Sequence, residues 1–195
     1  MPSDKENMLN GKTFRAFDKE LTQERAFAKE ILFEYNTLRP TEYAKRNELL
    51  KQLIGLKPKS CYIEPPFYCD YGYNIEIGNK FYANTNLTIL DSGKVTIGKN
   101  VFIGPNVGIY SVSHPIHHEP RNQYLEFARP ISIGDNVWIG GSVVINPGVN
   151  IGANTVIGSG SVVTKSIPEN VIAAGNPCKV IREITDEDKS FLPSI

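Results

Sequence analysis

The stretch IGDNVW-IGGSVV-INPGVN-IGANTV-IGSGSV, residues 133–162, decides the fold, because it places an aliphatic residue at every sixth position. The same register holds earlier in the chain, over residues 77–89 and 97–109. A second small or β-branched residue, such as Val137, follows four positions after each aliphatic residue of the first stretch. An amphipathic helix returns its apolar face every three to four residues, so the period of six excludes a helix here.

A period of six suits a coil of short strands with a tight corner after each strand. The glycine or asparagine that follows the aliphatic residue tolerates the backbone conformation of such a corner. One coil buries too little surface to be stable, whereas stacked coils form a continuous core. The sequence therefore predicts a mainly β protein, a parallel β-helix with five inward-pointing side chains: Ile133, Ile139, Ile145, Ile151 and Ile157. A sandwich of short strands is the alternative, and consecutive hexads in one register disfavour it.

The N-terminal part of the chain has a different pattern, with apolar residues at helical spacing over residues 8–56. Thr22 is the expected N-cap of a helix that runs towards Leu38. Thr41 is the expected N-cap of a second helix, and Gly55 the residue that ends it.

Two insertions interrupt the repeat, a short one around residues 91–93 and a long one that contains three histidines. Long loops within a rigid repeat are frequent sites of function. We therefore expect three parts: a helical segment over residues 1–57, a β-helix over 58–184 with an inserted loop at about 110–130, and a C-terminal tail over 185–195.

Composition excludes several classes of protein. The 195 residues carry 21 Lys and Arg against 21 Asp and Glu, so neither a nucleic acid nor a charged membrane surface is an expected partner. No apolar run approaches the ~20 residues that span a bilayer, and the polar start of the chain lacks the core of a signal peptide. Cys61, Cys69 and Cys178 have no metal-ligand spacing, which favours reduced thiols in a cytoplasmic protein.

Several motifs together resemble one family. They are FYAN at residues 81–84, SHPI at 113–116, IGDNVWIG at 133–140 and AAGNPCKVIR at 173–182. On these motifs the chain resembles the hexapeptide-repeat acyltransferases, and more narrowly the maltose, galactoside and nodulation acetyltransferases. The resemblance implies a left-handed parallel β-helix and a small N-terminal helical domain. It also implies an acetyl-CoA-dependent O-acetyltransferase that modifies a sugar hydroxyl, and a homotrimer with active sites at subunit interfaces.

Acetyl transfer from a thioester to a hydroxyl needs a base, and imidazole suits this task because it titrates near neutrality. The resemblance places His114 at the position of the family's general base, which implies direct transfer in a ternary complex. His117 and His118 are expected at the surface or on the acceptor side. A catalytic zinc site in this fold needs three histidines from separate coils, whereas all three lie here in one loop, so no metal is expected.

The resemblance also implies the residues of the acceptor pocket, whose short polar side chains can bond sugar hydroxyls: Asp70, Tyr82, Asn84, Asp91 and Glu126. Galactoside-specific relatives carry Asp at the position of Ala16 and Met at that of Glu126, which argues against β-galactoside specificity. Glu126 could orient His114, bind the acceptor, or be a solvated charge in the loop.

The expected CoA site lies on the C-terminal coils, where small residues permit close approach of the pantetheine arm and basic residues can pair with phosphates. Its residues are Trp138, Gly141, Ser159, Thr164, Lys165, Lys179 and Arg182. Two alternatives to the sugar O-acetyltransferase stay open at this point. One is an enzyme of the same fold with a non-sugar acceptor, such as an antibiotic or serine, and the other is a non-catalytic β-helix scaffold.

Overall fold

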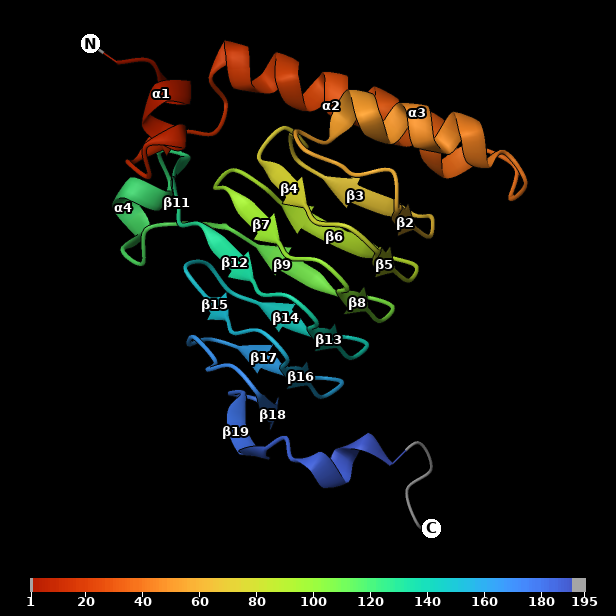
Figure 1. Ribbon diagram of the computed structural model, residues 1–195. Coiled ribbons are helices and arrows are strands. Elements are labelled where there is room, and N and C mark those ends of the chain that lie inside the picture. The colour runs from red at the N-terminus through yellow and green to blue at the C-terminus, as the bar shows by residue number, and fades with distance from the viewer. Residues whose placement is uncertain (1, 191–195) are drawn as a thin grey trace.

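Short parallel strands stack in three sheets around one apolar interior (Figure 1). The computed structural model describes residues 2–190. The first sheet contains β4 (Ile75–Ile77), β7 (Val95–Ile97), β12 (Ile131–Ile133) and β15 (Asn150–Ile151). The second contains β3 (Phe67–Cys69), β6 (Leu87–Leu90), β9 (Gly108–Tyr110), β14 (Val144–Ile145) and β17 (Val162–Val163). The third contains β2 (Cys61–Ile63), β5 (Phe81–Ala83), β8 (Phe102–Ile103), β13 (Trp138–Ile139), β16 (Val156–Ile157), β18 (Val171–Ala174) and β19 (Lys179–Glu183).

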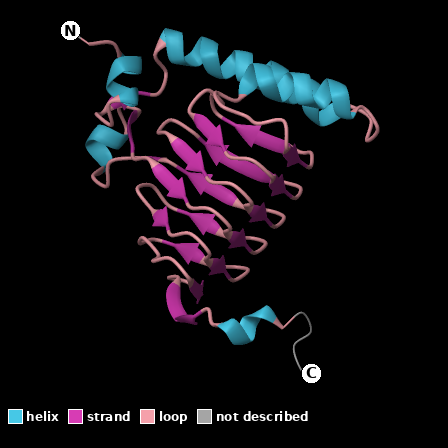
Figure 2. Cartoon of the chain, viewed as in Figure 1, coloured by secondary structure: helices cyan, strands magenta, loops and turns pink. Residues whose placement is uncertain are grey.

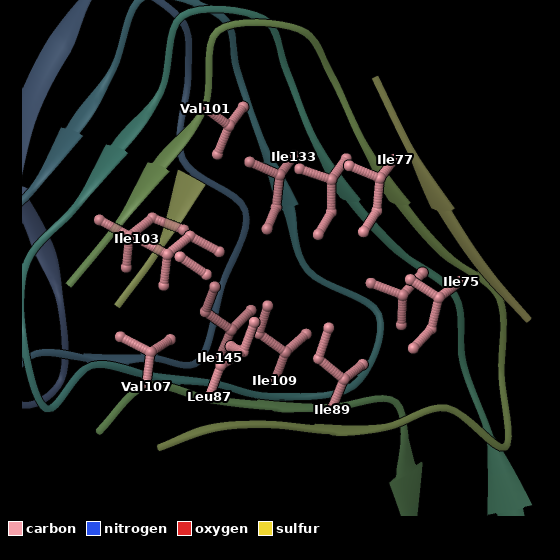
Figure 3. Close-up of a cluster of buried hydrophobic side chains, with 14 of the residues drawn as sticks. Ile75, Ile77, Leu87, Ile89, Val101, Ile103, Val107, Ile109, Ile133 and Ile145 are labelled. Carbon is pink, nitrogen blue, oxygen red and sulfur yellow. The ribbon is translucent and has the colours of Figure 1, made fainter. Parts of the chain in front are cut away.

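The hexad aliphatics form the core of this solenoid, as the sequence predicts. The five isoleucines of residues 133–157 are each at most 3% exposed. Parallel pairing sets each one upon its counterpart in the next coil, so that Ile133 pairs with both Ile97 and Ile151. Figure 3 shows such side chains converging on the interior of the coils. The predicted β-helix and its inward register are confirmed.

Asparagines occupy many of the corners between strands in the left-handed backbone conformation. Asn100, Asn136 and Asn154 have φ of 55°, 58° and 56°. Asparagine enters this region more readily than most other residues with a side chain. The Asn100 Nδ2 donates to Asn136 Oδ1 at 2.9 Å, and the Asn136 Nδ2 donates to Asn154 Oδ1 at 2.9 Å. The three side chains therefore form a ladder along one edge of the solenoid.

The N-terminal helices are α1 (Asp4–Leu9), α2 (Lys19–Thr37) and α3 (Tyr43–Leu53). The prediction that Thr22 caps α2 is wrong, because Asp18 lies one turn earlier and its Oδ1 accepts the N–H groups of Glu20 at 2.9 Å and Leu21 at 3.2 Å. The second predicted cap, Thr41, is also wrong. Glu42 occupies that position, and its carboxylate instead accepts the N–H of Arg39 at 2.9 Å.

The end of α3 agrees with the prediction in position but not in cause. Ile54 is the C-cap and Gly55 follows it. A Cβ at position 55 would lie 2.3 Å from the carbonyl oxygen of Tyr73. Glycine is therefore required here by the close approach of the next backbone segment, and not by a left-handed turn.

Helices α2 and α3 lie across the N-terminal end of the coil stack (Figures 1 and 2). Two side chains of α2 bond the first coil directly. The Tyr35 hydroxyl donates to the Ile63 carbonyl at 2.5 Å, and the Asn36 amide bonds both the N–H and the carbonyl of Phe67, at 2.9 and 3.0 Å. These bonds hold α2 in one orientation above the strands that border the site described below.

The long insertion folds into β10 (Val112–Ser113), the short helix α4 (His118–Arg121) and β11 (Leu125–Ala128). Strand β11 pairs antiparallel with β10 and, on its other side, with β1 (Phe14–Arg15). The N-terminal segment and the histidine loop are therefore joined in one small sheet, which the repeat pattern does not predict.

At the C-terminal end, β19 turns back and pairs antiparallel with β18. The 3₁₀ helix η1 (Asp186–Lys189) follows it, and residues 191–195 of the expected tail lie outside the described residues. None of the helices within residues 2–190 is long and apolar enough to cross a membrane.

Candidate active site

A cavity of about 500 Å³ lies where the N-terminal segment, the first coils and the histidine loop meet. This volume is in the range of small-molecule sites. The β1–β11 pairing brings the loop against the N-terminal segment, and the coils supply the other wall. The lining residues are Ala16, Phe17, Arg25, Asp70, Tyr71, Leu90, Ser92, Val112, His114, Arg121, Tyr124 and Glu126.

His114 follows directly after β10 and is half exposed, at 54% of its side chain. Its Nδ1 lies 3.4 Å from the carbonyl oxygen of Leu125, and its Nε2 lies 3.7 Å from Glu126 Oε1. Both neighbours are on β11, so the β10–β11 pairing fixes the position of the ring. With a proton on Nδ1, the ring donates towards Leu125 and leaves the Nε2 lone pair free to accept a proton.

Glu126 is mostly buried, with 18% of its side chain exposed. Burial raises the pKa of its carboxyl, while the neighbouring His114 opposes that rise. The Asp70 carboxylate acts in the same direction as burial, and Arg25 acts against it. Glu126 is therefore a carboxylate within reach of the imidazole, and it is not a fully solvated charge.

Asp70 and Arg25 form the next part of the wall. Burial raises the pKa of Asp70, and the positive charges of Arg25 and Lys29 act against that rise. The Arg25 Nη1 donates to the Tyr71 hydroxyl at 2.6 Å, and its Nη2 donates to the Ala16 carbonyl. Arg25 thus ties α2 to the first coil and to the segment before α2, and it sets a cation beside the Asp70 carboxylate.

Asp91 lies beneath this wall with no exposed surface. Its carboxylate accepts the N–H groups of Asp70, Tyr71 and Gly72, at 3.0, 2.9 and 2.7 Å. Burial raises the pKa of Asp91 to about 6, against the opposing effect of these backbone bonds. The next residue, Ser92, lines the cavity. Asp91 therefore shapes the backbone that presents Asp70 and Tyr71.

The other two residues expected at the acceptor pocket lie on the coils and not in the lining of this cavity. The Tyr82 ring stacks on Tyr62, with ring centroids 6.0 Å apart and planes 4° from parallel. The Asn84 Oδ1 accepts the N–H of Thr85 at 2.8 Å.

The residues expected at the CoA site also lie apart from the cavity, on the later coils and on β19. Trp138 is 57% exposed on β13. Arg182 pairs with Asp188 through two bonds of 2.7 and 2.6 Å. The cavity lining that the structure describes includes none of them: Trp138, Gly141, Ser159, Thr164, Lys165, Lys179 and Arg182. Within one chain, His114 therefore lies in the cavity, and the expected CoA residues lie outside it.

An apolar column runs along the outer face of the third sheet. Direct pairing aligns Tyr62, Tyr82, Phe102, Trp138, Val156 and Ile172. The corresponding outward positions of the first sheet are polar, namely Glu76, Thr96, Ser132 and Asn150. Outward faces of one solenoid therefore differ sharply in character.

Eight lining residues were not expected at the site from sequence, namely Phe17, Arg25, Tyr71, Leu90, Ser92, Val112, Arg121 and Tyr124. Phe17 and Tyr124 meet edge to face with centroids 5.0 Å apart, and the Arg121 Nη1 donates to the Ile116 carbonyl at 2.8 Å. Ser92 lies within the short insertion around residues 91–93, and this break in the repeat was the sequence feature that could have located it. Phe17, Arg121 and Tyr124 come together through the β1–β11 pairing, which the hexads do not predict, and Arg25 reaches the cavity from α2.

Within residues 2–190, no group of three or more His, Cys, Asp and Glu side chains is placed to hold a metal ion. His117 and His118 stack on each other with centroids 4.6 Å apart. The His117 Nδ1 accepts the N–H of Glu119 at 3.3 Å and so caps α4. These two histidines therefore have contacts within the loop itself.

Comparison with known proteins agrees with this architecture. Residues 7–56 match the family model of the maltose acetyltransferase hexapeptide capping motif, and residues 130–165 match that of the bacterial transferase hexapeptide. Galactoside O-acetyltransferase of Escherichia coli (strain K12) is 50% identical over 186 residues, which cover 95% of this chain and 92% of that relative.

Two solved structures are similar over almost the whole chain. A galactoside acetyltransferase in complex with coenzyme A has a TM-score of 0.95 and 49% identity, covering 100% of this chain and 96% of that chain. A maltose O-acetyltransferase from Clostridium difficile 630 has a TM-score of 0.93 and 48% identity, covering 95% and 99%. Full-length similarity at this level confirms the resemblance seen in the motifs. The chain belongs to the maltose and galactoside O-acetyltransferase family of hexapeptide-repeat acyltransferases.

Proposed function

We propose that this enzyme transfers the acetyl group of acetyl-CoA to a hydroxyl of a sugar. The observation that carries the proposal is the position of His114 in a ligand-sized cavity, held by β11 between the Leu125 carbonyl and the Glu126 carboxylate. The coenzyme A complex of a relative of 49% identity supports the donor. The names of the galactoside and maltose relatives support a sugar acceptor.

In the proposed mechanism, His114 Nε2 takes the proton of the sugar hydroxyl as its oxygen attacks the thioester carbonyl. The C–S bond then breaks, and the imidazolium returns the proton to the departing thiolate of CoA. A backbone N–H, for which we propose that of Gly141, stabilises the oxyanion between these steps. Asp70 and Glu126 would bind acceptor hydroxyls beside the base, with Tyr82, Asn84 and Asp91 completing or supporting the pocket.

We propose a homotrimer in which a second copy completes each site. The cavity with His114 and the expected CoA residues lie in separate parts of one chain, so a neighbouring chain would have to bring the second group to the first. The apolar column on the third sheet offers a surface to bury in such an assembly. The buried thiols of Cys61, Cys69 and Cys178 suit a reducing cytoplasm, where we place the reaction.

The test is an acetylation assay with acetyl-CoA and a panel of neutral sugars, with serine and an aminoglycoside as non-sugar acceptors. We expect His114→Ala to lower turnover by about 10²–10⁴, the usual contribution of a general base, with an unchanged dissociation constant for CoA. His118→Ala, a change in the same loop, is the matched control and should retain full turnover.

Full activity in His114→Ala would refute the assigned base. Acetyl label that accumulates on the protein without acceptor, at the rate of turnover, would refute direct transfer. Acetylation of a non-sugar acceptor in preference to every sugar would refute the sugar as acceptor and favour an enzyme with a non-sugar acceptor. Failure to bind CoA would refute the transferase and favour a non-catalytic scaffold.

A further inference from the structure

We infer that a second cavity beside the first is a binding site for the second ring of a disaccharide or longer oligosaccharide acceptor. This inference rests on the proposed function, because it extends the acceptor site of the same reaction. It assigns residues of α2 and β3 to acceptor binding, where the family motifs in the sequence assign none.

The second cavity measures about 520 Å³ and lies between α2 and the strands β3 and β6. Its lining comprises Lys29, Leu32, Phe33, Asn36, Thr37, Tyr68, Cys69, Asp70 and Leu90. Asp70 and Leu90 also line the cavity that contains His114. The two cavities therefore adjoin at Asp70 and Leu90, and the inferred ligand would extend from His114 past Asp70 into the second cavity.

Two aromatic rings dominate the exposed surface of the second cavity. Phe33 is 71% exposed and Tyr68 is 50% exposed, although both belong to regular elements of a well-packed protein. The Asn36 side-chain amide, by contrast, already forms hydrogen bonds with the N–H and the carbonyl of Phe67. The two aromatic residues are thus carried by α2 and β3, and much of their surface is exposed at the second cavity.

The polar groups of this cavity select among possible occupants. Asp70 can accept hydrogen bonds from hydroxyls and Lys29 can donate them, and their opposite charges act on each other. A purely apolar ligand would displace water from both charged groups without offering hydrogen bonds in its place, which is unfavourable. A pyranose ring has an apolar C–H face for Phe33 or Tyr68 and hydroxyls at its edge for Lys29 and Asp70. A neutral sugar ring therefore fits the chemistry of the whole lining.

The experiment compares glucose with maltose as acceptors under saturating acetyl-CoA. For Phe33→Ala and for Tyr68→Ala, we expect kcat/KM for maltose to fall about tenfold, mainly through KM, because binding remote from the reacting hydroxyl is lost. The value for glucose, which fills only the cavity at His114, should stay within about twofold of wild type. Phe27→Ala is the matched control, since Phe27 is a 60% exposed phenylalanine of α2 that lines a different cavity.

Equal losses for glucose and maltose in the Phe33 and Tyr68 variants would overturn the inference, and so would no loss for either sugar. A fall in molecular mass of those variants, measured by light scattering, would also overturn it by showing that the two rings contact another subunit. If wild type acetylates no sugar of the panel, the proposed function fails, whereas acetylation of other sugars without activity on maltose overturns this inference alone. The loss of maltose activity alone, at constant mass, supports it.

Discussion

Asp91 organises the floor of the cavity through three consecutive backbone N–H groups. A side chain with a single acceptor oxygen, such as that of asparagine, could not satisfy all three donors equally well, and a buried N–H without an acceptor costs about 1–3 kcal/mol. The residue therefore has a structural explanation that depends on the two oxygens of its carboxyl group, and burial disfavours the ionised form of that group.

The stability contributed by Asp91 should depend on pH in a defined direction. Its pKa of about 6 in the folded protein exceeds the ordinary 3.8, so the folded state holds this proton more tightly than the unfolded chain. That contribution is complete below about pH 4 and is lost as the pH rises to about 6. The loss is on the order of 3 kcal/mol if the pKa difference is realised in full.

Urea unfolding of wild type and Asp91→Asn at pH 4.5 and pH 6.5 measures this contribution, because the variant lacks the titrating group while other carboxyls are the same in both. We expect wild type to be more stable at both pH values, by a margin that is smaller at pH 6.5. A margin that is constant or that grows with pH would contradict the expectation.

The residues of this region were only partly predictable from sequence. The break in the hexad period located the short insertion, but the direction of its backbone decides that Ser92 lines the cavity while Asp91 is buried below it. Arg25 reaches the same cavity from α2, and its role depends on tertiary bonds to Tyr71 and Ala16. Such bonds leave no periodic signal in the chain.

Among the elements, the corners between strands combine backbone strain with side-chain bonding. Asn136 has a φ of 58° and bonds Asn100 on one side and Asn154 on the other. A left-handed conformation costs a residue with an ordinary Cβ roughly 1–2 kcal/mol. Glycine avoids that cost but offers no side chain to the ladder.

A pair of substitutions separates the two effects. We expect Asn136→Ala to lower the free energy of unfolding by about 2 kcal/mol, from the strain of the left-handed corner together with two lost hydrogen bonds. Asn136→Gly should lower it by less, since only the hydrogen bonds are lost. Equilibrium denaturation in urea measures both, and equal losses in the two variants would show that the ladder, and not the backbone conformation, dominates.

The strands were the most predictable elements because the hexads repeat one physical requirement, an inward aliphatic residue, in every coil. The helix boundaries were less so. Asp18 and Thr22 are both good capping residues, and the choice of Asp18 follows from where the chain leaves β1. The β1–β11 pairing joins residues far apart in sequence through short strands without a repeat, so neither strand could be located beforehand.

At the level of the whole molecule, the apolar column makes one outer face suited to burial against another copy. Phe102 lies in the middle of it, 54% exposed between Tyr82 and Trp138. We expect light scattering to give wild type three times the 21.7 kDa mass of one chain. Phe102→Glu should lower both the mass and the acetyltransferase activity, because a charge cannot be buried at the contact without a partner.

Thr96→Glu is the matched control, because Thr96 occupies an outward position on the polar first sheet. It should leave mass and activity unchanged. Wild type that has the mass of one chain in dilute solution and still acts at full rate would refute the shared site, and Phe102→Glu of unchanged mass would place the subunit contact on another face.

The two covered ends of the coil stack have a consequence for the size of the particle. A solenoid has no internal reason to stop, since its last coil presents unpaired N–H and C=O groups that the first coil of another molecule could extend into a fibre. Helices α2 and α3 cover one end, and at the other β19 pairs with β18 in the opposite direction, so a further parallel coil cannot pair directly with β18. Segments of the same chain thus cap both ends of the coil stack. The caps prevent end-to-end growth into a fibre, so the solenoid has a fixed length.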